Sequence, residues 1–282
     1  MTRDGAALEE DGRAEPVRAL GRAFDLTGRV AIVTGAGHGI GQGVARVLAA
    51  AGAVVVCADV DAGAAGATSE EIAAAGGSAA PAVVDVSRRD QVHDLVRAAA
   101  SEHGRVDVMC NNAGIIIDVP VLDLSEEQLD RVLAVNLKGV LFGCQAAGAV
   151  MRSQRAGSII NMASGAFDTA PARLVAYSIS KAGVVQITRT LAKELGPDGV
   201  RVNAIAPGLV ETDITRRHYT AEDGTVDEDK RERFLGRSRD LAPLRRIGTT
   251  EDVGHAALYL ASEAARFVTG QVLRPNGGVS MP

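Results

Sequence analysis

The chain has 282 residues, enough for one large domain or two small ones, and a formal net charge of -5 at pH 7. This negative balance argues against a nucleic-acid-binding surface, which would need a basic face. Aromatic residues make up 3% of the chain and tryptophan is absent, so the core must be packed from small aliphatic side chains. That composition favours buried strands alternating with close-packed helices over an aromatic-rich β-sandwich.

The cysteines and the apolar runs also exclude several classes of protein. Cys57, Cys110 and Cys144 are too few and too scattered for a disulfide framework or a zinc site, and we expect them to be buried. The sequence lacks an apolar run of about 18 residues and a signal-peptide layout. We therefore expect a cytoplasmic protein without a membrane segment or a bound metal.

The first 24 residues differ from the rest of the chain. They are charged, rich in glycine and alanine, and show little strand periodicity. We predict a flexible N-terminal extension over residues 1–24 and a single catalytic domain over residues 25–282.

From residue 25 onward, apolar strand-like runs alternate with helical stretches. Strands are predicted at residues 29–34, 54–59, 79–84, 106–111, 158–162, 201–206 and 271–274. The intervening helices are predicted to end near residues 51 and 75 and to span residues 91–103, 126–152 and 177–195. Repeated β-α-β units with apolar strands predict an α/β fold, in which helices cover both faces of a parallel sheet.

One segment, residues 213–246, breaks the alternation. It is dense in charged residues and lies where a crossover connection would be expected. Two interpretations stay open from the sequence: a solvated surface excursion, or a mobile lid over a substrate pocket.

A glycine-rich turn, TGAGHGIG at residues 34–41, follows the first strand and opens the first helix. Gly35, Gly39 and Gly41 are spaced G-x-x-x-G-x-G. Glycines allow the backbone to turn sharply and approach a ligand, and the free N–H groups of a helix N-terminus suit a pyrophosphate. The alternative is a strand-to-helix turn that binds no nucleotide.

The end of the second strand carries a carboxylate, Asp59. In this position it can hydrogen-bond the ribose hydroxyls of an adenine dinucleotide and would repel a 2′-phosphate. His38 could supply some positive charge, but histidine is mostly neutral at pH 7. The sequence therefore favours NAD over NADP, although Asp59 could also be a turn or capping residue.

A second pattern suggests proton transfer. Tyr177 and Lys181 are four residues apart in a predicted helix, so they share one face, and Ser164 lies thirteen residues upstream of the tyrosine. A free phenol has a pKa of about 10. A neighbouring ammonium group favours the phenolate and makes it a usable base near neutral pH.

In this order and spacing, the motifs resemble those of the short-chain dehydrogenase/reductase family. The resemblance extends over residues 26–281. Its motifs are TGAGHGIG at 34–41, Asp85-Val86, NNAG at 111–114, Asn136 in VNLKG, Ser164 in NMAS, YSISK at 177–181 and PGLVET at 207–212.

The resemblance implies a doubly wound Rossmann sheet of about seven strands, a homotetramer or homodimer, and a catalytic tetrad of Asn136, Ser164, Tyr177 and Lys181. Asp85 and Val86 would lie along the adenine, Asn112 near its ribose, and Val210 and Thr212 near the nicotinamide amide. The complete implied cofactor-binding set is Gly35, His38, Gly39, Ile40, Gly41, Asp59, Val60, Asp85, Val86, Asn112, Ala113, Gly114, Tyr177, Lys181, Pro207, Gly208, Val210 and Thr212. Taken singly, Asn136 could kink a helix, Ser164 could cap a loop and Asp85 could be a helix N-cap.

The implied reaction is reversible hydride transfer between NAD and a small secondary alcohol or ketone. Tyr177 would exchange the hydroxyl proton, Ser164 would hold the substrate oxygen, Lys181 would lower the tyrosine pKa, and Asn136 would support a proton relay. Motif adjacency indicates a largely apolar substrate pocket made by Ile116, Ala166, Phe167 and Leu209.

Two alternative functions stay open. The motifs also resemble those of NADPH-dependent 3-oxoacyl-[acyl-carrier-protein] reductases; Asp59 argues against their phosphate, and Arg155 could serve in carrier docking. A non-catalytic nucleotide-binding relative is the other alternative, and the presence of all four tetrad residues argues against it. Residues 274–278 read RPNGG where the family often has Val-Asp-Gly-Gly, which puts the oligomer geometry in doubt.

Overall fold

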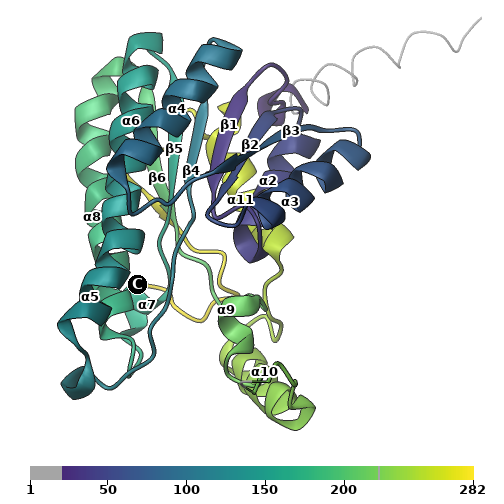
Figure 1. The fold of residues 1–282 in the computed structure, drawn as a ribbon, viewed down its shortest axis with the longest axis vertical. Helices are drawn as coiled ribbons and strands as arrows, with labels where there is room; N and C mark the ends of the chain where they lie inside the picture. Colours follow the sequence, from purple (N-terminus) through teal and green to yellow (C-terminus); the bar gives the residue numbers. More distant parts are fainter. Residues whose placement is uncertain (1–20, 222) are drawn as a thin grey trace, which may run out of the picture.

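The computed structural model describes residues 21–221 and 223–282, and its centre is a seven-stranded parallel sheet of order β3-β2-β1-β4-β5-β6-β7 (Figure 1). Its strands are β1 (Val30–Thr34), β2 (Val54–Asp59), β3 (Ser78–Val83), β4 (Val108–Asn111), β5 (Gly157–Met162), β6 (Val200–Ile205) and β7 (Val272–Leu273). Its helices are α2 (Gly39–Ala50), α3 (Ala62–Ala74), α4 (Arg89–His103), α5 (Glu126–Leu133), α6 (Gly139–Gln154), α7 (Ala166–Thr169), α8 (Val175–Leu195), α9 (Asp213–Arg216), α10 (Glu228–Leu241) and α11 (Thr250–Ala261). Short helical turns are η1 (Val121–Asp123), η2 (Ala134–Lys138), η3 (Gly196–Asp198) and η4 (Glu263–Ala265).

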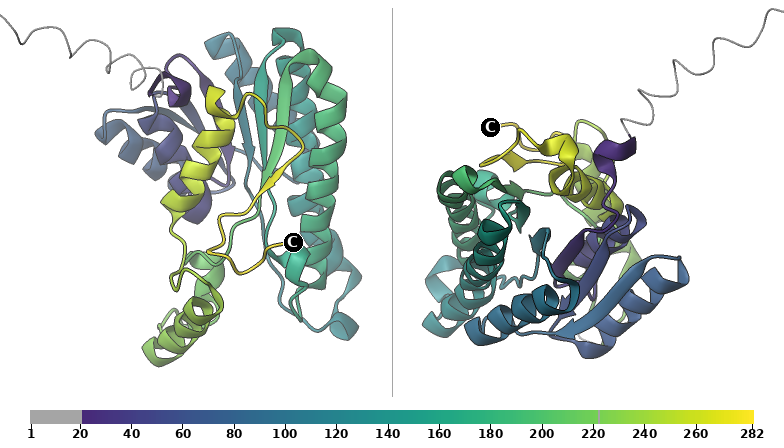
Figure 2. Two further views of the ribbon diagram at one scale, coloured as in Figure 1. Left: turned by 180° about the vertical axis from the view of Figure 1, so that it is seen from behind. Right: turned by 90° about the horizontal axis from the view of Figure 1, so that it is seen from above.

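Helices cover both faces of the sheet, which confirms the predicted doubly wound α/β fold (Figure 2). Helices α4, α6 and α8 pack on one face, and α2, α3 and α11 pack on the other. Each face has its own hydrophobic cluster, made mainly of valine, alanine, isoleucine and leucine. The buried cysteines belong to these clusters, as predicted.

Small residues allow the close helix packing that an aromatic-poor core needs. Helices α2 and α11 meet through Gly43 and Gly254. A Cβ on Gly254 would lie 2.6 Å from Cγ2 of Val47, and one on Gly43 would lie 2.4 Å from Cβ of Thr250. Larger side chains would therefore force these two helices apart.

The predicted long helix at residues 126–152 is interrupted. A π-helical turn, η2, lies between α5 and α6 and contains Asn136. The combined stretch Glu126–Gln154 is long and apolar enough to span a bilayer by length and composition, but half of its most apolar window is buried in the fold. Its burial against β4 and β5 is that of a core helix.

The segment 213–246 is helical and projects beyond the carboxyl ends of the strands (Figure 1). Its base is fixed by Glu211, which accepts two hydrogen bonds from Arg231 at 2.8 and 3.1 Å and one from the Tyr219 hydroxyl at 2.9 Å. Tyr219 is buried. The segment is thus a folded excursion, and its motion as a lid stays a prediction.

The predicted N-terminal extension lies outside the described residues up to residue 20, and residues 21–24 are helical.

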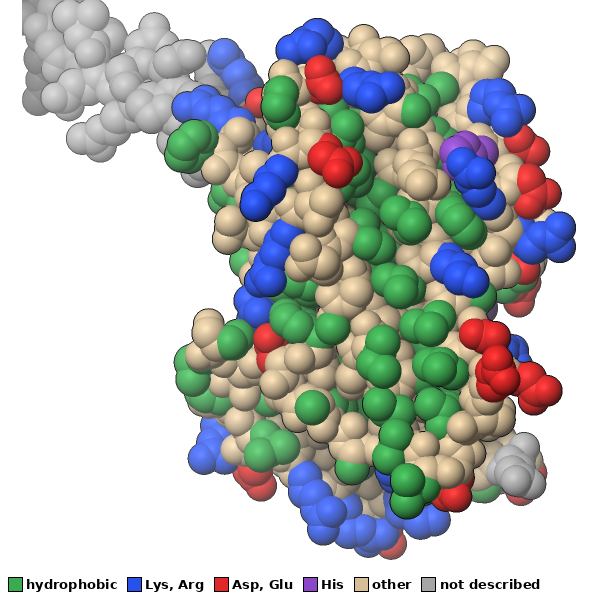
Figure 3. All heavy atoms as spheres, turned by 90° about the vertical axis from the view of Figure 1, so that its left-hand side faces the viewer, with side chains coloured by type: hydrophobic (Ala, Val, Ile, Leu, Met, Phe, Trp, Pro, Cys, Tyr) green, Lys and Arg blue, Asp and Glu red, His purple; other side chains and the backbone are tan. Residues whose placement is uncertain are grey.

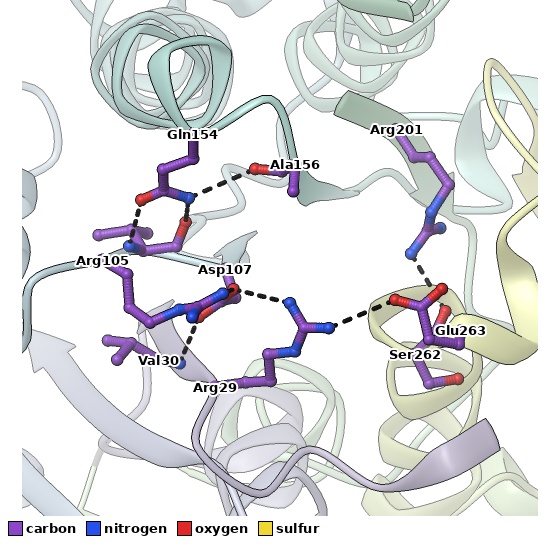
Figure 4. Close-up of polar contacts among 10 residues, drawn as sticks. Arg29, Val30, Arg105, Asp107, Gln154, Ala156, Arg201, Ser262 and Glu263 are labelled. Carbon is purple, nitrogen blue, oxygen red and sulfur yellow. Dashed lines mark hydrogen bonds and ion pairs between the residues drawn. The ribbon is translucent and has the colours of Figure 1, made fainter. Parts of the chain in front are cut away.

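A polar network lies at the opposite edge of the sheet, where the strands begin (Figure 4). Asp107, with a side chain only 4% exposed, accepts hydrogen bonds from Arg105 at 2.7 and 2.5 Å, from Arg29 at 3.1 Å and from the Val30 amide at 2.9 Å. Burial alone would raise the pKa of Asp107, but these hydrogen bonds outweigh it and hold the pKa below its ordinary value. The ionised carboxylate therefore joins the starts of β1 and β4.

We expect Asp107→Ala to lower the free energy of unfolding by about 3 kcal/mol at pH 7, because it leaves buried donors without their acceptor. Since the folded-state pKa of Asp107 is depressed, its contribution is present above the unfolded value of about 3.9 and is lost as pH falls through the folded value. Urea denaturation across pH 3–7 measures both effects. Asp94→Ala, which removes an exposed ion pair to Arg97, is the control and should change stability little. Equal losses in the two variants would contradict the assignment.

Candidate active site

A cavity of about 870 Å³ opens at the carboxyl ends of the strands. Most of the residues that the sequence predicted for the site line it. They are Gly35, His38, Gly39, Ile40, Asp59, Val60, Asp85, Val86, Asn112, Ala113, Gly114, Ile116, Ser164, Ala166, Tyr177, Lys181, Pro207, Gly208, Leu209, Val210 and Thr212. Three predicted residues, Gly41, Asn136 and Phe167, do not line it.

The glycine turn forms one end of the cavity. Gly35 and Gly39 adopt φ values of +65° and +54°, a region that favours glycine. A Cβ on Gly41 would lie 1.9 Å from the Gly35 carbonyl oxygen, so Gly41 acts behind the wall by letting α2 begin against the turn. Helix α2 directs its first N–H groups, which have no intrahelical acceptor, toward the cavity lined by Gly39 and Ile40. This arrangement fits a pyrophosphate.

Asp59 lies beside this turn at the end of β2. Its Oδ2 accepts a hydrogen bond from the Gly37 amide at 2.9 Å, and its Oδ1 accepts one from the Asp61 amide at 3.1 Å. Each carboxylate oxygen can accept a second bond, so the side chain is both fixed in place and able to receive ribose hydroxyls. Residues 34–41 and 59–66 contain no lysine or arginine. The turn thus presents a carboxylate and no lysine or arginine to a bound ribose.

Asp85 and Asn112 hold neighbouring parts of the wall. Asp85 Oδ1 accepts hydrogen bonds from the amide and hydroxyl of Ser87 at 2.9 and 2.7 Å. The N-cap of α4 is Arg88, so the alternative interpretation of Asp85 as an N-cap is wrong. Asn112 Nδ2 donates to the carbonyls of Thr34 and Gly35, at 3.0 and 3.2 Å, and thereby joins the end of β4 to the glycine turn.

Tyr177 and Lys181 lie one turn apart on α8, as the spacing predicts, with the Lys181 Nζ 5.5 Å from the centre of the tyrosine ring. Nζ donates a hydrogen bond to the Met162 carbonyl at the end of β5, at 2.7 Å. Ser164, two residues beyond Met162, lines the same cavity as the Tyr177 phenol and acts to lower its pKa. The end of β5 and one face of α8 thus bring the three groups together.

Burial is the largest influence on the pKa values of Tyr177 and Lys181. It raises the pKa of Tyr177, against the opposing effects of the Ser164 hydrogen bond and the positive charge of Arg217. Burial also lowers the pKa of Lys181 to about 8. Sequence reasoning assigned the charge that lowers the tyrosine pKa to Lys181, whereas in the structure the cation with this effect is Arg217, from the 213–246 segment.

Asn136 is fully buried behind the cavity wall, within the π-helical turn η2. Its Oδ1 accepts from the Ile115 amide at 2.8 Å, and its Nδ2 donates to the Ile115 carbonyl at 2.9 Å and to the Ser180 hydroxyl at 3.2 Å. Asn136 therefore fixes the backbone of the wall to α8. The alternative interpretation, that Asn136 kinks a helix, agrees with its place in the π-helical turn between α5 and α6.

Phe167 is turned away from the cavity. It packs against the hydrophobic cluster and lies beneath the Arg274 guanidinium, whose carbon is 5.2 Å from the ring centre. Arg274 donates two hydrogen bonds to Asp168, at 2.8 and 3.2 Å. The arginine in the RPNGG stretch therefore fastens the C-terminal segment to α7, beside the substrate end of the cavity.

Sequence reasoning missed several lining residues, including Arg131 of α5 and two further groups. The 213–246 segment contributes Asp213, Ile214, Thr215, Arg217 and His218, and the C-terminal segment contributes Asn276, Val279 and Ser280. The charge density of the first segment was the available signal, but it did not identify which of its cations faces the cavity. Within the described part of the chain, no cluster of three or more His, Cys, Asp or Glu side chains could hold a metal ion.

Known proteins are similar to this chain over almost its whole length. Residues 35–280 match the family described as "Enoyl-(Acyl carrier protein) reductase". A 3-oxoacyl-[acyl-carrier-protein] reductase FabG of Thermotoga maritima is 38% identical over 254 residues, which cover 90% of this chain and 98% of the relative. A D-threitol dehydrogenase of Mycolicibacterium smegmatis is 35% identical over 258 residues, 92% of this chain and 95% of the relative.

The fold has close counterparts among solved structures. A gluconate 5-dehydrogenase from Burkholderia cenocepacia, solved in complex with NADP and tartrate, superposes with a TM-score of 0.84 at 31% identity, covering 92% of this chain and 98% of that one. The family match, the relatives, the sheet order and the geometry of the cavity all point to the same family. The chain belongs to the short-chain dehydrogenase/reductase family of NAD(P)-dependent oxidoreductases, which act on CH–OH groups.

Proposed function

We propose that the protein interconverts a secondary alcohol and its ketone with NAD, using Asn136, Ser164, Tyr177 and Lys181. The observation that carries the proposal is the convergence of the Ser164 hydroxyl, the Tyr177 phenol and the Lys181 ammonium on one wall of a cavity whose other end fits a dinucleotide. The nicotinamide supplies hydride chemistry when bound. The remaining cofactor-binding residues are proposed in the roles that the family resemblance implies.

The protein's part in the reaction is to hold the alcohol and move one proton. The Ser164 hydroxyl and the Tyr177 phenol both bind the substrate oxygen, and Tyr177 as phenolate takes its proton during oxidation. Lys181, held by the Met162 carbonyl, places a positive charge beside the phenol. Asn136 acts indirectly, because its two bonds to Ile115 keep the opposite wall in place.

The preference for NAD is supported by Asp59 and by the absence of lysine and arginine in the two turns around it. A 2′-phosphate beside a fixed carboxylate would meet like-charge repulsion. The Burkholderia relative, in contrast, was solved in complex with NADP.

A second candidate, reduction of a 3-oxoacyl-[acyl-carrier-protein], is favoured by the Thermotoga relative. Arg155, considered for carrier docking, does not support it. It donates to Asp198 at 3.0 Å and to the Pro197 carbonyl at 2.9 Å, and it lies just before β5, at the sheet edge opposite the cavity. A carrier docked on Arg155 would be remote from Tyr177.

We also propose a homodimer or homotetramer. Hydrophobic side chains gather on the face over α6 and α8 (Figure 3), where Leu141 and Ile179 are exposed. A second copy covering this face would remove the apolar surface from water.

Sedimentation velocity of the wild type and of Ile179→Glu tests the assignment, and an unchanged monomer in both would contradict it.

Replacing Tyr177 with phenylalanine should lower kcat/KM by at least about a hundredfold, because the proton acceptor is lost. The Kd for NAD, measured by calorimetry, should stay within about twofold. That limit corresponds to a change in binding free energy well below the roughly 1.4 kcal/mol that makes a factor of ten. Tyr259→Phe, a matched change on α11 outside the cavity, should retain activity. Equal loss of turnover and of NAD binding in Tyr177→Phe would instead indicate a structural role, and full activity would show that Tyr177 is not the proton acceptor.

The cofactor assignment predicts that Asp59→Ser lowers kcat/KM with NAD about 10- to 100-fold, the equivalent of losing hydrogen bonds to a charged group. The same change should raise kcat/KM with NADP, since the repelling charge is gone. Asp61→Ser is the control: it changes the same charge two residues away, outside the cavity, and serine can retain the N-cap bond to Ala64. If the wild type already prefers NADP, the assignment of Asp59 is wrong.

A further inference from the structure

Arg217 is a cation at the substrate end of the cavity that the proposed reaction does not use. It follows α9, on the segment that projects over the carboxyl edge of the sheet, and it lines the same cavity as Ser164 and Tyr177. Its positive charge acts to lower the pKa of the Tyr177 phenol across this shared cavity. The two groups come from segments 40 residues apart, so the fold rather than the local sequence brings them together.

The guanidinium has few protein partners. Nη1 donates to the Ile214 carbonyl, whereas Nε is buried and has no hydrogen-bond acceptor. Among the described residues, none forms an ion pair with Arg217. Its neighbour Arg216, in contrast, is 3.6 Å from a carboxylate oxygen of Asp213. A half-buried guanidinium that lacks acceptors is costly unless another group supplies them.

Nearby protein acids do not meet this need. Asp118 influences the pKa of Arg217, but no hydrogen bond or ion pair among the described residues joins the two, and its Oδ1 accepts a hydrogen bond from Arg173 at 2.5 Å. Asp213 also lines the cavity but is held by Arg216. His218, which also lines the cavity and stacks on Phe234 at 4.6 Å between ring centres, supplies no negative charge.

The remaining walls at the substrate end offer few groups that could bind an anion. Its wall is largely apolar, with contributions from Ile115, Ile116, Ala166, Leu209 and Val279. A carboxylate entering this chamber would therefore find Arg217 as its natural partner, because a guanidinium presents paired N–H groups that match the two carboxylate oxygens. Since Nε is inaccessible in this conformation, its use would require the side chain to turn toward the cavity.

We propose that Arg217 binds a carboxylate of the substrate, so that the physiological substrate is a hydroxy acid and the product the corresponding oxo acid. The proposal rests on the dehydrogenase function proposed above and names its substrate class. The same cation serves the chemistry, because it stabilises the Tyr177 phenolate. Arg217 is thus a specificity-determining residue that touches the substrate, and Ser164 and Tyr177 handle the carbinol.

The kinetic test compares acids with their amides. Wild type, Arg217→Gln, Arg217→Lys and the control Arg216→Gln are assayed with NAD on 3-hydroxybutanoate, gluconate and the primary amide of each. We expect the wild type to prefer at least one acid over its amide by about tenfold or more, and Arg217→Gln to reduce that ratio about 10- to 100-fold. Arg217→Lys should keep part of the preference, and Arg216→Gln should keep all of it.

A second readout separates recognition from folding. For the neutral amide, Arg217→Gln should move the acidic limb of the kcat/KM profile to higher pH, because removal of the positive charge raises the pKa of Tyr177. The titratable and charged groups around Tyr177 and Arg217 stay unchanged in this variant: Lys181, whose pKa is about 8, and Asp118, Arg173, Asp213 and His218. A merely destabilised protein would lose activity without moving the limb.

A binding measurement keeps the proposal distinct from the dehydrogenase function. Calorimetry with NAD-saturated protein compares saturated four- to six-carbon monocarboxylates, such as pentanoate, with pentanamide. Tighter binding of the acid in the wild type, lost in Arg217→Gln, supports the carboxylate site even if turnover fails. Equal affinity for acid and amide, or an unchanged ratio in Arg217→Gln, overturns it. Absence of NAD reduction with every alcohol tested would overturn the proposed function instead.

Discussion

The site depends on the burial of two ionisable groups, Tyr177 and Lys181, on one face of α8. Placing a phenol and an ammonium away from water raises the pKa of the first and lowers that of the second to about 8. Both shifts disfavour the charged forms that proton transfer requires. The surrounding structure must therefore return favourable interactions, and it does so through the Met162 carbonyl, the Ser164 hydroxyl and Arg217.

The two edges of the sheet differ in how far their polar groups are hydrogen-bonded within the protein. At the amino edge, the Asp107 network satisfies a buried carboxylate with several donors and joins β1 to β4. At the carboxyl edge, the N–H groups that begin α2 and the guanidinium of Arg217 have spare hydrogen-bonding capacity. Stability is concentrated at one edge, and binding capacity at the other, as expected when ligands bind beyond the carboxyl ends of parallel strands.

Much of the fold could be predicted because its signals are local. The apolar strands, the glycine turn and the spacing of Tyr177 and Lys181 each determine backbone geometry within a few residues. The π-helical turn at Asn136 could not be predicted, since it leaves the apolar pattern of the helix intact and its hydrogen-bond partner, Ile115, lies 21 residues away. Phe167 was placed in the pocket by motif adjacency, but its ring direction depends on Arg274, 107 residues further along. Arg217 was hidden among many charged neighbours, and only the tertiary fold distinguishes it.

The C-terminal segment, fastened by Arg274 to Asp168, gives the substrate chamber an unusual construction. Asn276, Val279 and Ser280 line the cavity from one side, and residues 213–218 line it from another. Neither stretch carries the ladder hydrogen bonds that hold the sheet together. Substitutions in them can alter molecular recognition with little effect on the core, because surface connections tolerate change better than packed strands do. This division of labour leaves the reaction machinery constant and gives natural selection two independent places at which to reshape substrate preference.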